Sequence, residues 1–417
     1  MKKSKPTKLQ LKIKELRMAH GWLFVAFIGL LALGTNNVFS STFVIDSADG
    51  SLFNYLFRHV VAAIAGLIAG SFLYFLDYQL WRQKVIPLVA IVLLLLLAVK
   101  GVGVEVNGAK RWINIGLFQF QPSELAKLTV ILYMAKALSD TMRRKEPIEF
   151  FPYQEAWRHR PWYWRIAGMI VPYPAIGIPA VLACLVMLQP DAGTAIVIMS
   201  VPLLMMVISG AHLKKIAAHI VILGSVFTYY LLSASYRMDR IKAWWDPEAY
   251  ASNLGYQVKQ SMIAIGSGGL TGQGVGEGVS KFRYLPEAHT DFAFAIVAQE
   301  GGFIMSALVL LAFFLIGYYG IITARNCRHP FGMFTALGIT LYFCGQGLIN
   351  IAMVCDVLPV VGVPLPFISY GGTSLIVNLM AAGLLLNIAR TNLREAQEER
   401  KALLQQQKEA LAWKGVP

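Results

Sequence analysis

Residues 84–103 read KVIPLVAIVLLLLLAVKGVG, an apolar run with a lysine at its start and another near its end. A helix needs about 20 such residues to cross the hydrocarbon core of a bilayer. Similar runs recur along the chain of 417 residues, which is 56% hydrophobic and only 14% charged. Because the runs are continuous and do not alternate, they argue against a β-barrel and predict an all-α polytopic membrane protein.

We expect about ten transmembrane helices, each close to the length that a bilayer requires. The weakest covers 122–140, because it carries Glu124, Lys127 and Lys136. A long extracytoplasmic loop at 235–290 separates the seventh and eighth helices. The chain is thus divided into an N-terminal tail (1–21), a transmembrane domain (22–390) and a C-terminal tail (391–417). The expected spans are 22–46, 56–76, 84–103, 122–140, 168–188, 193–211, 214–234, 291–320, 332–355 and 366–388.

The net charge of +14 is distributed in a way that indicates membrane topology and not nucleic-acid binding. Seven basic residues precede the first span, and others fall in alternate short loops and in the C-terminal tail. Such loops usually face the cytoplasm, so we expect both termini inside, with the basic N-terminal tail against anionic lipid. The four cysteines are scattered and show neither metal-ligand spacing nor a disulfide framework.

Four irregular segments are predicted to converge on the opposite, extracytoplasmic face. They are 104–124, 189–194, 235–291 and 358–374, and they are rich in Gly, Pro, amide and charged residues. Irregular polar backbone at membrane depth has to line a cavity or be buried in protein. We therefore expect a functional site on this face.

The segment Tyr284–Phe292, YLPEAHTDF, concentrates Glu287, His289 and Asp291 where an apolar helix begins. Such a cluster suggests proton transfer at a membrane surface. The Gly-rich stretch at 267–276 lets backbone approach a ligand, and its amides could face phosphates. It lacks the Lys-Ser/Thr ending of a P-loop, so nucleotide hydrolysis is not expected.

Three further candidates each admit a structural interpretation beside a functional one. Glu124 and Lys127 share a helix face, so they form either a helix-start ion pair or the lining of a polar cavity. Arg111 could bind a phosphate while the indole of Trp112 stacks on a sugar, or Trp112 could be an interfacial anchor. Asp191 either caps the sixth span or joins the site.

Seven motifs occur in the order seen in the SEDS family of cell-wall polymerases, and the chain resembles that family over roughly residues 85–390. The spelling LPEAHTDF is more similar to the division branch (FtsW) than to the elongation branch (RodA), with sporulation members close to the former. The chain departs from the family pattern at Gln299 and at Asp356. The motifs are GAKRW (108–112), QPSELAK (121–127), QPDAGTA (189–195), YRMDRI (236–241), AIGSGGLTGQGVG (264–276), LPEAHTDFAFA (285–295) and PLPFISYGGTS (364–374).

The resemblance implies peptidoglycan glycosyl transfer from lipid II, for septal wall synthesis in cell division. It implies Asp291 as the base for a sugar hydroxyl, with Glu287 as a rival base or an orienting partner. A class B penicillin-binding protein transpeptidase is the implied partner, together with other division proteins. No cofactor is firmly indicated, although a divalent cation (Mg²⁺ or Mn²⁺) could share the diphosphate. The expected substrate-binding residues are Arg111, Trp112, Glu124, Lys127, Arg240, Gln257, Lys259, His289, Ser369 and Gly371.

Two functions of other classes remain open on the residues alone. A flippase for a lipid-linked precursor would also explain ten spans and a polar cavity, but its polar residues should extend through the full depth of the membrane. A non-catalytic scaffold that recruits a transpeptidase would have no need for Asp291. The gathering of the polar motifs on one face favours an enzyme that acts at that face.

Overall fold

The computed structural model describes residues 8–48, 53–106, 108–116, 119–144, 174–211, 213–246, 248–250, 254–282 and 284–413. It confirms the all-α class, since a helix occupies each of the ten segments expected to span. These helices are α1 (Lys8–Ala48), α2 (Asn54–Phe75), α3 (Gln79–Val102), α4 (Pro122–Arg144), α7 (Pro174–Met187), α8 (Ala192–Ile208), α9 (Leu213–Leu232), α12 (Ala293–Arg325), α13 (Pro330–Val354) and α14 (Gly372–Trp413).

Within the described ranges, six helices are long and apolar enough to cross a membrane by themselves: α1, α2, α3, α12, α13 and α14. A seventh span exists if the bent pair 219–232 and 237–245, with an angle of 95°, counts as one. Helices α7 and α8 are apolar but shorter, and α4 carries buried charge at Glu124 and Lys127. The expected number of ten spans therefore stays a prediction.

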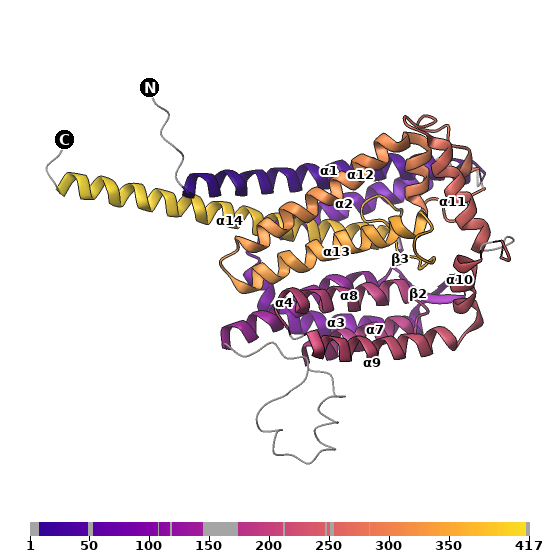
Figure 1. Cartoon of the computed structure of the whole chain (residues 1–417), viewed down its shortest axis with the longest axis horizontal. Helices are drawn as coiled ribbons and strands as arrows, with labels where there is room; N and C mark the ends of the chain where they lie inside the picture. Colours follow the sequence, from indigo (N-terminus) through magenta and orange to yellow (C-terminus); the bar gives the residue numbers. More distant parts are fainter. Residues whose placement is uncertain are drawn as a thin grey trace, which may run out of the picture.

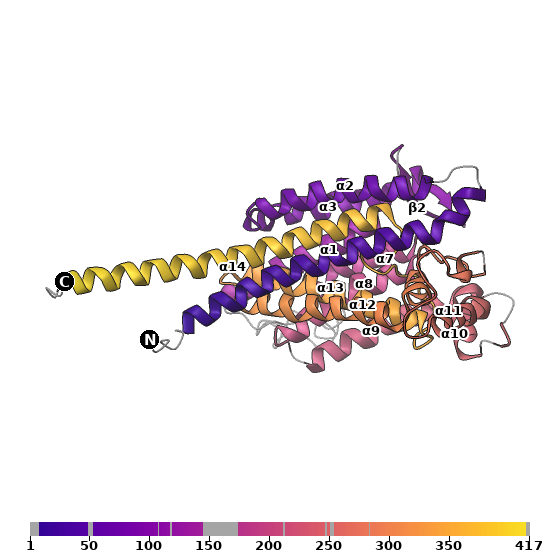
Figure 2. The ribbon, with the colours of Figure 1, turned by 90° about the horizontal axis from the view of Figure 1, so that it is seen from above.

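The helices lie side by side, with the start of α1 and the end of α14 at the same end of the bundle (Figures 1 and 2). At this end α1 packs on α14 through a small apolar cluster that includes Leu16 and Ala396. Helices α2 and α14 approach so closely that a Cβ on Gly383 would meet the carbonyl oxygen of Gly70. Glycine at this position therefore permits close packing of the two helices.

The irregular segments gather at the opposite end of the bundle, as the sequence predicts (Figure 1). The segment 104–120 folds into a three-stranded antiparallel sheet, which the sequence analysis does not anticipate. Its strands are β1 (Val104–Val106), β2 (Ala109–Asn114) and β3 (Gln119–Phe120). The sheet leads directly into α4 and holds Arg111 on its central strand β2.

The expected long loop at 235–290 is largely structured. It contains α10 (Ser235–Trp245), α11 (Leu254–Gly268) and a 3₁₀ turn at Val279–Lys281. The Gly-rich stretch after α11 packs on a break in α12 at Gly302, where φ is 63° and ψ is −161°. The amides of Gln273 and Gly274 donate to α12 carbonyl oxygens at 3.0 and 3.1 Å. These amides bind the exposed carbonyls of a broken helix, so the interpretation that they face phosphates is wrong for them.

Candidate active site

Asp291 lies just before α12, and its backbone is fixed by an amide from a neighbouring helix. The Nδ2 atom of Asn350 on α13 donates to the carbonyl oxygen of Asp291 at 2.8 Å and to that of Val363 at 2.7 Å. Asn350 is fully buried. One side chain thus joins the start of α12 to the Pro-rich segment before α14, and so places Asp291 relative to that segment.

Arg240 on α10 approaches Asp291 across a glycine. A Cβ built on Gly362 would stand 3.3 Å from an Asp291 carboxylate oxygen and 3.7 Å from an Arg240 guanidinium nitrogen. Gly362 has φ of 70°, a conformation that glycine adopts without strain. The same guanidinium donates to the carbonyl oxygen of Val360 at 3.2 Å. A side chain at position 362 would therefore separate the acid from the cation.

Burial raises the pKa of Asp291 to about 6. The negative charge of Glu287 and, less strongly, that of Asp191 raise it too, whereas the positive charges of Arg240 and Arg111 lower the same pKa. Because these interactions require proximity, the fold has brought Asp291 together with two other carboxylates and two cations, all from three of the four irregular segments. A carboxyl with a pKa near 6 is a suitable proton acceptor at neutral pH.

Arg111 is positioned by backbone and not by a carboxylate partner. Its Nε donates to the carbonyl oxygen of Gln189 at 2.9 Å, and a terminal nitrogen donates to that of Pro190. Trp112 lies beside it, with the guanidinium carbon 5.9 Å from the ring centre. Because carbonyl oxygens orient the guanidinium without neutralising it, Arg111 retains a full positive charge for an anionic ligand.

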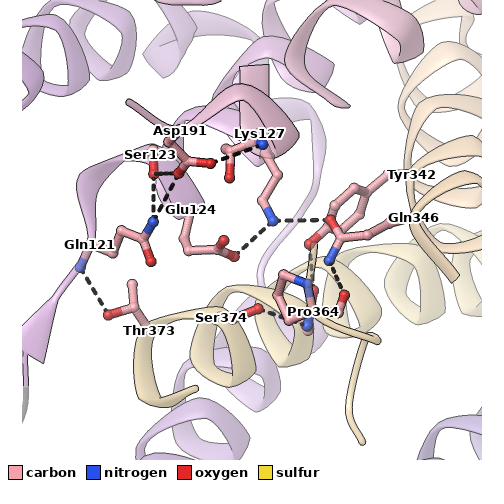
Figure 3. Close-up of polar contacts among 12 residues, drawn as sticks. Gln121, Ser123, Glu124, Lys127, Asp191, Tyr342, Gln346, Pro364, Thr373 and Ser374 are labelled. Carbon is pink, nitrogen blue, oxygen red and sulfur yellow. Dashed lines mark hydrogen bonds and ion pairs between the residues drawn. The ribbon is translucent and has the colours of Figure 1, made fainter. Parts of the chain in front are cut away.

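Asp191 is the N-cap of α8, which confirms the capping interpretation. Its carboxylate accepts from the backbone amide of Thr194 at 3.1 Å. It also accepts from the side chain of Gln121 at 3.2 Å and from Ser123 at 3.5 Å (Figure 3). This carboxylate therefore ties the start of α4 to the start of α8.

Glu124 and Lys127 form the expected ion pair within α4, with 2.9 Å between Lys127 Nζ and a Glu124 oxygen. Each has only 2% of its surface exposed. Lys127 also donates to Gln346 Oε1 at 3.0 Å, and Gln346 Nε2 donates to the carbonyl oxygen of Pro364 at 2.8 Å (Figure 3). The pair thus supports the Pro-rich segment behind Asp291.

Glu287 and His289 face different surroundings from Asp291. Glu287 is exposed, has φ of 54° and accepts from Thr290 Oγ1 at 2.7 Å. The backbone oxygen of His289 accepts from the amide of Tyr370 at 2.8 Å. The centre of the His289 ring lies 5.4 Å from the centre of the Tyr55 ring. Burial lowers the pKa of His289, and the charge of Glu287 opposes that shift. His289 is held in an aromatic cluster.

The remaining expected residues occupy the rim and the supporting loop. Ser369 is buried, and its Oγ accepts from the amide of Leu365 at 2.8 Å. Gly371 immediately precedes α14. On α11, Gln257 is half-buried and Lys259 is exposed. The structure thus places Ser369 as a loop-fixing residue and leaves Lys259 accessible from solvent.

Sequence reasoning missed several residues that hold the site. Asn350 and Gln346 are separated by one helical turn in an apolar helix, a spacing that could have identified them. A second buried ion pair, Lys281 with Glu300 at 3.1 Å, gave no local signal because the partners are far apart in sequence. Glu300 also accepts from Ser40 on α1 at 2.5 Å.

The arrangement provides a proton acceptor and two guanidinium groups at the end of the bundle where the irregular segments gather. Such a set can deprotonate a hydroxyl and stabilise an anionic leaving group. Among the described residues there is no group of three or more His, Cys, Asp or Glu side chains that could hold a metal ion.

The chain is similar to known proteins over most of its length. It is 35% identical over 372 residues to a protein of Trichlorobacter lovleyi named as a probable peptidoglycan glycosyltransferase FtsW, covering 88% of this chain and 92% of that one. It is 37% identical over 375 residues to the stage V sporulation protein E of Bacillus subtilis, covering 88% and 96%. The chain is thus similar both to a protein named FtsW and to a sporulation protein.

Solved structures of the same shape include a chain of a peptidoglycan synthase complex that coordinates polymerization and crosslinking. Its TM-score is 0.65 at 28% identity, covering 89% of this chain and 97% of that one. The crystal structure of the rod shape determining protein RodA of Thermus thermophilus has a TM-score of 0.60 at 27% identity, covering 88% and 95%. The family model for FtsW, RodA and SpoVE, described as a cell cycle protein, matches residues 21–394. The chain therefore belongs to the FtsW/RodA/SpoVE family.

Proposed function

We propose that this protein is a peptidoglycan glycosyltransferase that polymerises lipid II into glycan strands at the outer face of the cytoplasmic membrane. Membership of the family and the names of the relatives support the reaction class. The observation that carries the assignment to a site is that Asp291, with a pKa near 6, lies across Gly362 from Arg240 and is influenced by the charges of both Arg240 and Arg111. An acid of this kind suits the acceptor hydroxyl, and the guanidinium groups suit a diphosphate.

In the proposed step a sugar hydroxyl gives its proton to Asp291 while its oxygen bonds to the anomeric carbon of the second substrate. The bond from that carbon to the lipid diphosphate breaks, and the diphosphate leaves with the electron pair. Arg111 and Arg240 would balance the negative charge that develops on it. Glu287, exposed and close to Asp291, would orient the acceptor or adjust the pKa of Asp291.

The position of the buried ion pair of α4 and of Asn350 favours an enzyme over a flippase. Glu124 and Lys127 lie in the first two turns of α4, and Asn350 lies in the last turns of α13. The strands lead directly into the start of α4 and Asn350 binds the carbonyl oxygen of Asp291, so all three lie near the end of the bundle where the irregular segments gather. We place that end outside and both termini in the cytoplasm, as the basic loops indicate. A septal role and a class B penicillin-binding protein partner follow from the likeness to FtsW and to the synthase complex.

The test is polymerisation of lipid II by the purified protein, with the Asp291→Asn protein prepared identically as the control for contaminating polymerases. We expect glycan chains from the wild type, more of them when the transpeptidase is added, and none from the variant. Parallel reactions with EDTA and with added Mg²⁺ or Mn²⁺ show whether a divalent cation is needed. Equal product from wild type and variant, or none from the wild type under all these conditions, would reject the proposal.

A further inference from the structure

A cavity of about 310 Å³ lies between α1, α2 and α14. It runs beside residues 20–28 of α1, 67–74 of α2 and 379–386 of α14. Gly70 and Gly383, which let α2 and α14 approach closely, contribute to its lining. Its apolar wall includes Phe24, Phe27, Ile28, Leu67, Leu379 and Leu386.

One end of this groove is polar and positively charged. His20 Nε2 and the hydroxyl of Tyr74 lie 3.1 Å apart. The guanidinium of Arg390 lies 5.0 Å from the centre of the Tyr74 ring and 5.2 Å from that of Phe75. Arg390 is exposed. The apolar groove therefore ends at an exposed cation and two hydrogen-bonding side chains.

We propose that this groove binds an anionic phospholipid of the bilayer, with one acyl chain between α1, α2 and α14 and the phosphate against Arg390. The eight residues from Leu67 to Tyr74 span about 10 Å of helix, well within one leaflet of a hydrocarbon core about 30 Å thick. Aromatic rings and long cationic side chains commonly mark the level of lipid head groups. The charge at the mouth selects an anionic lipid, and the apolar wall selects its acyl chain.

Arg390 is the residue that should distinguish anionic from zwitterionic lipid. We expect native mass spectrometry of the purified protein to retain phosphatidylglycerol in preference to phosphatidylcholine. Arg390→Gln should reduce that preference about fivefold, the effect of one cation near a membrane surface. Arg394→Gln is the matched control, because Arg394 is an exposed arginine of the same helix that pairs with Glu398 at 2.9 Å. Equal retention of the two lipids by the wild type would overturn the proposal, as would an equal loss in both variants.

A second measurement needs no substitution. Phosphatidylglycerol with a photoreactive group on its acyl chain should label residues 67–74 and 379–386 of the wild-type protein. Labelling spread evenly over other exposed apolar positions, such as Val221 and Phe303, would show ordinary contact with the bilayer and would contradict a defined site. Competition with a polyprenyl phosphate tests the identity of the lipid. Displacement of phosphatidylglycerol at equal concentration would show that the groove selects an isoprenoid instead.

Discussion

Asp291 and Glu287 are carboxylates only four residues apart, but the fold gives them opposite surroundings. Asp291 is half-buried, its backbone is bound by Asn350, and it lies near Arg240 and Arg111. Glu287 is exposed, and its carboxylate accepts a hydrogen bond from the hydroxyl of Thr290. Sequence proximity therefore does not make two acids equivalent. In the proposed reaction the tightly held acid accepts the proton, and the exposed acid acts on it through its charge.

The largest expected effect is loss of the Asp291 carboxylate. Asp291→Asn preserves the shape of the side chain but cannot accept a proton, so the rate of lipid II polymerisation should fall about 10²- to 10⁴-fold. The measurement is a rate under saturating lipid II, accompanied by thermal unfolding to show that the variant is folded. A fall of less than about threefold in a folded variant would remove Asp291 from the role of base.

Asn350→Ala should have the next largest effect, because it releases the backbone of Asp291 without touching its carboxylate. Two carbonyl oxygens lose their donor, which should cost about 1–3 kcal/mol of stability and lower the rate about tenfold. Asn387→Ala is the matched control, since Asn387 donates to the carbonyl oxygens of Leu73 and Tyr74 at the far end of the bundle. Equal rate losses in the two variants would mean that Asn350 acts only through stability.

The sequence predicted the helices well because each apolar run is a local signal. It did not predict the strands at 104–120, nor α10 and α11 within the expected long loop. The strands and α10 are short and largely polar, and α11 packs on α12. The break in α12 was not predicted for the same reason. Gly302 is non-helical at the point where amides of the Gly-rich stretch donate to the carbonyl oxygens of α12.

The two buried lysine–glutamate pairs show how much of the site the sequence could reveal. Glu124 and Lys127 are three apart in one helix, so their pairing follows from helix geometry. Lys281 and Glu300 belong to different elements, and no short-range sequence pattern predicts their contact. The position of Asp291 was predictable from its motif. Its neighbourhood with Arg240 was not, because it depends on the backbone at Gly362.

Arg240→Gln removes one positive charge near Asp291 and leaves the carboxylate itself in place. The positive charge of Arg240 lowers the pKa of Asp291, so its removal should raise that pKa above about 6. If the unprotonated carboxylate is the active form, the acidic limb of the pH–rate profile should then move to higher pH. Arg237→Gln, three residues earlier on α10, is the control and should leave the limb in place. An unmoved limb in Arg240→Gln would separate this cation from the titrating group.

Glu287→Gln should have the smallest effect and the opposite sign. The negative charge of Glu287 raises the pKa of Asp291, so the neutral amide should lower it and move the acidic limb to lower pH. The shift should be modest because charges exposed to solvent are screened by salt. The rate at pH 8 should stay within about threefold of wild type, since Asp291 is then unprotonated in both proteins. Glu277→Gln, an exposed acid of the preceding loop, should leave the limb unmoved. A loss at pH 8 as large as that of Asp291→Asn would make Glu287 a second essential acid and end the distinction between the two.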